Sequence, residues 1–132
     1  MREIKFRGLT VDGEWVYGDL YNDLPGATAY YNECPRRIVW QGENGHLNQP
    51  VKNGTEGQYT GLKDKNGKEI YEGDVCKTYE IGYGVNTDVV CFDNGSFIFR
   101  SKHRLDIELR GCKTDYIEII GNIHENLELL VN

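Results

Sequence analysis

The chain has 132 residues, enough for one domain or for two small β subdomains that share a core. It carries 21 acidic and 15 basic residues, a formal charge of −6, which argues against a duplex-binding protein because nucleic acid usually meets a net positive face. Sixteen glycines beside nine tyrosines, four phenylalanines and two tryptophans favour short strands, tight turns and a thin aromatic core. These totals predict a mainly β protein.

The cysteines provide no metal-binding motif. They are far apart in the sequence and form no Cys-x-x-Cys pair, so we expect no structural zinc, and no other cofactor. The N-terminus lacks the apolar run of a signal peptide, and no segment is apolar enough to span a membrane. We therefore expect a cytoplasmic protein with reduced thiols.

The first elements are predicted from alternation and turn residues. Residues 2–20 form a hairpin whose turn is at Asp12-Gly13. Residues 37–41 (RIVWQ) form a short strand that places Ile38, Val39 and Trp40 in the core. Residues 42–53 are polar and contain Pro50, so we interpret them as a loose linker between an N-terminal β unit and the rest.

The central block, GQYTGLKDKNGKEIYEGDV at residues 57–75, has the clearest local signal. Asn66-Gly67 separates two segments with β-type alternation, and both turn residues accept positive φ, so a hairpin is predicted there.

Short segments with β character follow at regular spacing. This spacing favours a barrel or sandwich over βαβ units, and no amphipathic helix of ordinary length is present. The segments are strands at 74–79, 88–92, 96–100 and 116–123, a glycine-rich connection at 81–86, a strand or loop at 105–109, and a helical turn at 125–130.

Four motifs spread over nearly the whole chain resemble the YopX family: REIKFRG, EWVYGDL, the central block, and IEIIGNIHENLELL. The resemblance implies a phage or prophage protein, mainly β, with an N-terminal β-hairpin subdomain (1–57) packed with a C-terminal SH3-like small β-barrel (58–132). It brings no activity, substrate or catalytic residue. His124 and Leu127 replace a tyrosine and a proline that are usual in the family's tail, so the terminal turn lacks that rigid residue.

No constellation of catalytic residues is apparent. A base–nucleophile pair such as Cys91 with His103 would need hydrogen-bond contact, for which there is no local signature. We interpret the scattered aspartates as turn residues rather than metal ligands. These aspartates are Asp74, Asp88, Asp93, Asp106 and Asp115. The protein is therefore expected not to be an enzyme.

Two basic stretches and several tyrosines are the candidate interaction residues. Basic loops beside exposed aromatics could bind single-stranded nucleic acid by phosphate contacts and stacking. Alternatively, the lysines only protect an exposed hairpin edge from pairing. The candidates are Lys63, Lys65, Lys68, Tyr71, Tyr83, Arg100, Lys102 and Arg104.

Two functions remain open. The first is a non-catalytic module that binds a protein partner or a second copy of itself, suggested by the aromatic content and the exposed strand edges. The alternative is a single-stranded nucleic-acid-binding accessory protein of phage replication or regulation. Neither function involves a membrane.

Overall fold

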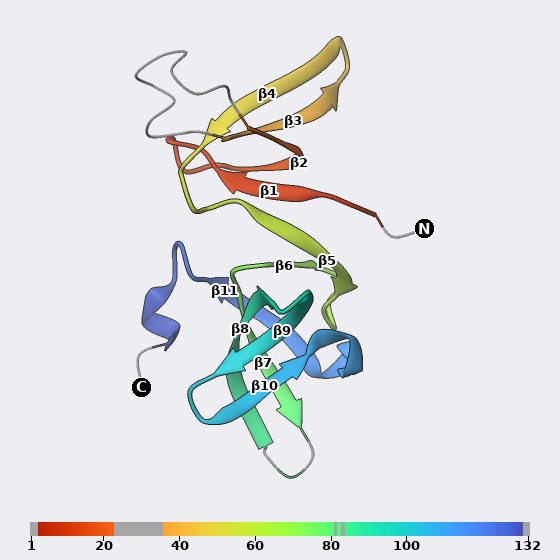
Figure 1. Cartoon of the computed structure of the whole chain (residues 1–132), viewed down its shortest axis with the longest axis vertical. Helices are drawn as coiled ribbons and strands as arrows, with labels where there is room; N and C mark the ends of the chain where they lie inside the picture. Colours follow the sequence, from red (N-terminus) through yellow and green to blue (C-terminus); the bar gives the residue numbers. More distant parts are fainter. Residues whose placement is uncertain (1–2, 23–35, 81, 83, 131–132) are drawn as a thin grey trace. The chain divides into compact units, whose positions relative to one another are not determined.

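The structure of the protein, a computed structural model, describes residues 3–22, 36–80, 82 and 84–130 (Figure 1). Cys34 and Tyr83 lie outside this part of the chain. The described residues contain eleven strands and three short 3-10 turns, and the protein is mainly β as predicted. The strands are β1 (Phe6–Leu9), β2 (Trp15–Asn22), β3 (Arg36–Gly42), β4 (Gly45–Val51), β5 (Gly57–Lys63), β6 (Glu69–Tyr71), β7 (Asp74–Glu80), β8 (Gly84–Asp93), β9 (Ser96–Ser101), β10 (Arg104–Glu108) and β11 (Ile117–Asn122).

Hydrogen bonding orders the described strands into two sheets, β4-β3-β2-β1-β5-β6 and β10-β9-β8-β7-β11. The chain divides into two compact units, Met1–Tyr59 and Thr60–Asn132, so that β5 begins in the first and ends in the second. No helix among the described residues is both long and apolar enough to cross a membrane.

The first unit is an antiparallel meander. The predicted hairpin at its start is present as β1 and β2, with Arg7 opposite Tyr17. The predicted strand at 37–41 is β3, in which Ile38 is fully buried while Val39 and Trp40 are half-buried. Alternation places Val39 on the opposite face of β3 from Ile38, whereas Trp40 shares the face of Ile38 and is only partly covered.

The predicted linker at 42–53 is wrong, because most of it is the strand β4. β4 pairs with β3 from Gly42–Gly45 to Arg36–Val51. Most of its side chains are exposed, and its apolar residues Leu47, Pro50 and Val51 do not alternate regularly with polar ones, so it lacks the pattern by which a strand is recognised. Pro50 is compatible with this strand because β4 lies at the edge of its sheet, where a missing N–H costs little.

The second unit folds around a core of side chains from most of its strands. The fully buried cluster consists of Ile70, Cys76, Val90, Phe99, Leu109 and Ile117. β7, β8, β9 and β10 follow one another as antiparallel neighbours, and β11 returns to pair with β7. This arrangement is compatible with the predicted SH3-like barrel.

The Asn66-Gly67 turn is present, and a buried carboxylate holds its loop. Asp64 Oδ1 accepts hydrogen bonds from the N–H groups of Asn66 and Lys68, and its Oδ2 accepts one from Ile119 in β11. The N–H of Lys65 donates to the carbonyl of Ile117. The hairpin loop is thereby fastened to β11, 55 residues away from Asp64 along the chain.

The connection predicted at 81–86 is shorter than expected. β8 begins at Gly84, which pairs with Glu80, so that Val85 and Asn86 are strand residues. Gly84 has a φ of 72°, in the left-handed region that glycine tolerates, which lets the chain reverse close to the strand ends. Farther along, the segment that could be strand or loop is β10, and the tail ends in the 3-10 turn η3 (Leu127–Leu130).

Candidate functional site

Two tyrosine rings lie side by side on the surface of the second unit. Tyr79 comes from the end of β7, and Tyr116 from the 3-10 turn η2 (Thr114–Tyr116) that leads into β11. Their ring centroids are 5.6 Å apart, with the planes tilted by 57°. Each residue is 49% exposed. We call this pair the tyrosine ridge.

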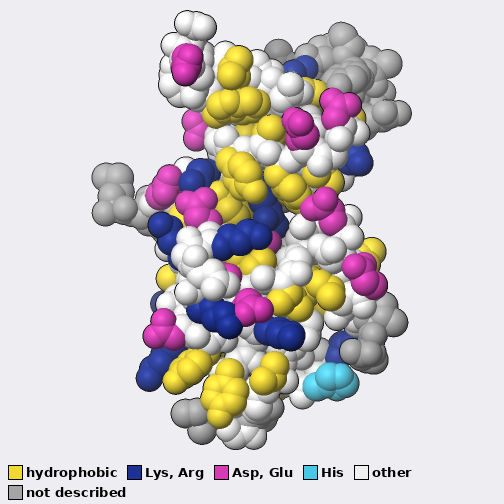
Figure 2. Space-filling model, turned by 180° about the vertical axis from the view of Figure 1, so that it is seen from behind, with side chains coloured by type: hydrophobic (Ala, Val, Ile, Leu, Met, Phe, Trp, Pro, Cys, Tyr) yellow, Lys and Arg dark blue, Asp and Glu magenta, His cyan; other side chains and the backbone are white. Residues whose placement is uncertain are grey.

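The β-sheet explains why these rings meet. β7 pairs with β11, with Thr78 opposite Ile117, so the residues that follow and precede this pair are brought together. Across the other edge of β7, Tyr79 faces Val85, which is 68% exposed. Figure 2 shows hydrophobic side chains gathered at the end of the second unit where β7 ends and β8 begins. Such a gathering of apolar surface is a usual mark of an interaction site.

A pocket of about 530 Å³ lies on one side of the ridge. This volume is within the range of sites that take small molecules or anchoring side chains. The pocket is lined by Thr78, Tyr79, Glu80, Ile107, Glu108, Gly111, Cys112, Lys113, Tyr116 and Ile117.

A smaller hollow of about 250 Å³ lies on the other side, and it shares Thr78, Tyr79 and Tyr116 with the larger one. Its remaining lining residues are Lys65, Lys77, Val85, Asp115 and Glu118. The ridge thus separates two depressions, a shape that suits an apolar side chain of a partner on either side of the rings.

A buried group of charges borders the larger pocket. The Arg104 guanidinium lies 2.5 Å from Asp88 and 3.3 Å from Glu80, and its side chain is only 4% exposed. The Thr78 hydroxyl donates a hydrogen bond to Asp88. Burial raises the pKa of Asp88 above its ordinary value, although Thr78 and Arg104 oppose this shift.

This group corrects the turn interpretation of Asp88. The residue is fully buried within β8 and bonded to side chains of β7 and β10, instead of flanking a turn. The turn interpretation is also wrong for Asp106, which lies in the middle of β10 and binds Arg100 at the surface together with Asp93 at the end of β8. No group of three or more potential metal ligands is found within the described part of the chain.

Cys112 is the thiol of the larger pocket. Its Sγ donates to the carbonyl oxygen of Glu108 at 3.4 Å. Burial raises the pKa of the Cys112 thiol, although the charge of Arg104 acts in the opposite direction. A thiol of raised pKa stays protonated at neutral pH and is a poor nucleophile.

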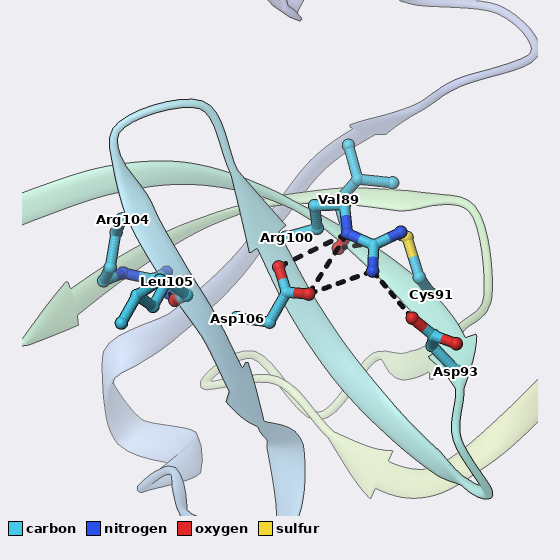
Figure 3. A network of polar contacts seen from close by, with 7 residues as sticks. All are labelled: Val89, Cys91, Asp93, Arg100, Arg104, Leu105 and Asp106. Atoms are coloured by element: carbon cyan, nitrogen blue, oxygen red, sulfur yellow. Dashed lines mark hydrogen bonds and ion pairs between the residues drawn. The ribbon is translucent and has the colours of Figure 1, made fainter.

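The two arginines among the predicted basic residues are engaged by carboxylates. Figure 3 shows the Arg100 guanidinium between Asp93 and Asp106, each with an N–O distance of 2.9 Å. Arg104 is buried with Asp88 and Glu80, and does not lie at the surface as the basic stretch suggested.

The lysines of the central hairpin lie at its tip. Lys65 forms an ion pair with Glu118 at 2.6 Å, whereas Lys63 and Lys68 are exposed. Lys102 is exposed as well, near the end of β9. The structure therefore brings the basic residues of the two stretches into different surroundings and does not assemble them around one site.

The predicted tyrosines have different positions. Tyr71 is only 2% exposed and its hydroxyl donates to Glu69, so its ring is not on the surface. Tyr83 lies outside the described residues. The ridge itself was not predicted, because Tyr79 and Tyr116 are 37 positions apart and meet only through the β7–β11 pairing. The apolar-polar alternation of residues 74–79 was the one signal available for this face.

Comparisons with known proteins support the resemblance seen in the sequence. A family model described as "YopX protein" matches residues 5–131. No curated protein matches the chain. The crystal structure of protein EF1440 from Enterococcus faecalis is similar, with 23% sequence identity over 99% of this chain and 100% of that one and a TM-score of 0.55. At this identity the likeness concerns the fold alone. The match over nearly the full length shows that the chain belongs to the YopX family.

Proposed function

We propose that the chain is a non-catalytic interaction protein of a phage or prophage, which binds a protein partner or a second copy of itself in the bacterial cytoplasm. The observation that carries this proposal is the tyrosine ridge, in which two half-exposed rings lie between two depressions. Tyrosines that fill or border pockets contribute much of the affinity of protein interfaces, because they bury a large area at a low entropic cost.

The chemistry of the larger pocket supports binding over catalysis. Glu80 and Asp88 both hold Arg104, so these charges are engaged in structure. Cys112 has a raised thiol pKa, and none of the pocket-lining residues is a histidine that would act as its base. The apolar surface from Ile107 and the two rings suits the side chain of a partner.

Affinity capture from the lysate of a bacterial host, with quantitative mass spectrometry, tests this function. The double variant Tyr79→Ala/Tyr116→Ala removes the ridge, and Tyr21→Ala removes an exposed tyrosine (53% exposed) from β2 in the first unit as a matched control. We expect the partner proteins to be captured by the wild type and by Tyr21→Ala but not by the double variant. The double variant should lose about 2 kcal/mol or more of binding free energy for these partners. Light scattering on the same three proteins detects self-association. If all three proteins capture the same partners and have the same mass in solution, the ridge is not the binding site.

The alternative function is binding of single-stranded nucleic acid. Exposed Lys63, Lys68 and Lys102 support it, whereas the ion pairs of Arg100 and Arg104 weaken it. A salt titration with labelled oligonucleotides distinguishes this function from protein binding. Phosphate contacts give an affinity that falls steeply with salt, whereas an affinity that depends on burial of the tyrosine ridge changes little with salt.

A further inference from the structure

A second groove in the same unit has a different chemistry from the tyrosine ridge. It is about 530 Å³ in volume and lies between β8, the end of β9 with the turn after it, and the C-terminal turn η3. It shares no lining residue with the larger pocket beside the ridge. We call it the basic groove, and it is lined by Val85, Asn86, Thr87, Val89, Arg100, Ser101, Lys102, His103, Leu129 and Leu130.

The polar end of the basic groove carries basic side chains, although Asp93 and Asp106 bind one of them, Arg100. Arg100, Lys102 and His103 line it and no aspartate or glutamate does, although the whole chain has a charge of −6. Lys102 Nζ has no hydrogen-bond or ion-pair partner among the described residues. Arg100 uses its Nε and Nη2 for Asp106 and Asp93, which fixes the guanidinium and leaves Nη1 without a partner in the part of the chain that is described.

The other end of the groove is aliphatic. Val85 and Val89 come from β8, and Leu129 and Leu130 from η3. None of the lining residues is a phenylalanine, tyrosine or tryptophan, so His103 is the one ring in the lining on which a base of a single-stranded nucleic acid could stack. A ligand that satisfies both ends carries a carboxylate close to an aliphatic side chain.

We propose that the basic groove binds an acidic segment of a protein partner, in which carboxylates flank a leucine, isoleucine or valine. A carboxylate meets Lys102 beside His103, and the aliphatic side chain lies against Val85, Val89 and Leu129. Complementary charge directs the segment to the groove, and the aliphatic contact supplies area that a free anion lacks. Neither Tyr79 nor Tyr116 lines the groove, although Val85 is common to the groove and to the smaller hollow beside the ridge.

Fluorescence anisotropy with the full chain tests this proposal. The probe is a labelled ten-residue peptide of glutamates around two central leucines, and two comparison peptides replace either the glutamates by glutamine or the leucines by alanine. We expect the peptide of glutamates and leucines to bind about tenfold more tightly than either of the two comparison peptides. Lys102→Glu should weaken its binding about tenfold, and Val85→Ser about threefold, since both side chains are exposed and the fold tolerates their replacement.

Lys68→Glu is the matched control, because it makes the same change of charge at an exposed lysine outside the groove. Its affinity for the peptide should stay within about twofold of the wild type. Four results would each overturn the proposal. Two concern the specificity of the site: equal weakening by Lys68→Glu and Lys102→Glu, or equal binding of the glutamine peptide. The other two are stronger binding of an oligothymidylate of the same charge and no binding of any peptide at millimolar concentration. Tyr79→Ala/Tyr116→Ala should leave this binding unchanged, so that failure of the ridge and failure of the groove are seen separately.

Discussion

Replacing Asp64 by asparagine changes one atom of the group that fastens the central hairpin to β11. Oδ1 of Asp64 accepts two loop N–H groups at 2.9 Å, and Oδ2 accepts the Ile119 N–H at 3.0 Å. Asparagine can keep its carbonyl oxygen toward the loop, but its amide nitrogen then faces the Ile119 N–H, donor against donor. Losing a hydrogen bond to a charged acceptor in a buried position costs roughly 1.5–3 kcal/mol.

Hydrogen exchange followed by NMR measures this cost at the Ile119 amide. If that amide exchanges by local opening, Asp64→Asn should speed its exchange by roughly 10- to 150-fold, because each 1.4 kcal/mol corresponds to a factor of ten. Asp115→Asn removes an exposed aspartate of the same unit and should leave the Ile119 rate unchanged. An unchanged rate in Asp64→Asn would refute the role of this carboxylate.

The pH dependence gives a second check. Burial raises the pKa of Asp64, but the N–H groups of Ile119, Lys68 and Asn66 outweigh it and hold the pKa below the ordinary value of 3.8. The ionised carboxylate therefore stabilises the fold fully above pH 3.8, and this contribution is lost as the pH falls through the lower, folded-state pKa. The difference between wild type and Asp64→Asn should shrink in that acidic range, and a difference that does not change there would contradict the assignment.

Three further predictions follow from other parts of the structure. Gly18→Ala places a Cβ 2.2 Å from the Val39 carbonyl oxygen and should destabilise the first unit by about 1–3 kcal/mol. Urea unfolding followed by tryptophan fluorescence measures this loss, because Trp15 and Trp40 both lie in that unit. An unchanged urea midpoint would contradict the prediction. Asp88→Ala leaves Arg104 buried with only Glu80 and should lower the free energy of unfolding by about 3 kcal/mol, measured by far-UV circular dichroism in urea. The double variant Asp88→Ala/Arg104→Met should recover much of this loss, because both charges of the buried pair are removed. A double variant as unstable as the single one would count against the buried pair. Cys112 should react more slowly with iodoacetamide at pH 8 than the same cysteine in the urea-unfolded chain, because its pKa is raised, and equal rates by mass spectrometry would contradict this.

Local signals predicted much of the fold. The Asn66-Gly67 turn and the alternation in 37–41 and 96–100 lie within a few residues of the features that they determine, so β3, β5, β6 and β9 could be anticipated. β4 could not, because an edge strand with exposed polar side chains has no apolar pattern. Its pairing depends on the backbone of β3, which composition does not reveal.

The candidate site was less predictable because its parts come together through sheet pairing. Asp88 and Arg104 are on β8 and β10, and Tyr79 and Tyr116 are on β7 and η2. The sequence identified Arg100 and Arg104 as basic, but their carboxylate partners depend on strand register. Register also buries Tyr71 while it exposes Tyr79, and alternation alone does not say which face of a strand is covered.

Photo-crosslinking from the tyrosine ridge in living bacteria tests the central claim most directly. A photoreactive phenylalanine analogue is placed at Tyr116, and in a matched protein at Tyr21, which is a similarly exposed tyrosine of the first unit. The interaction function predicts a discrete crosslinked protein or a crosslinked dimer from position 116 and a much weaker adduct from position 21. No adduct from position 116, or the same adducts from both positions, would contradict it.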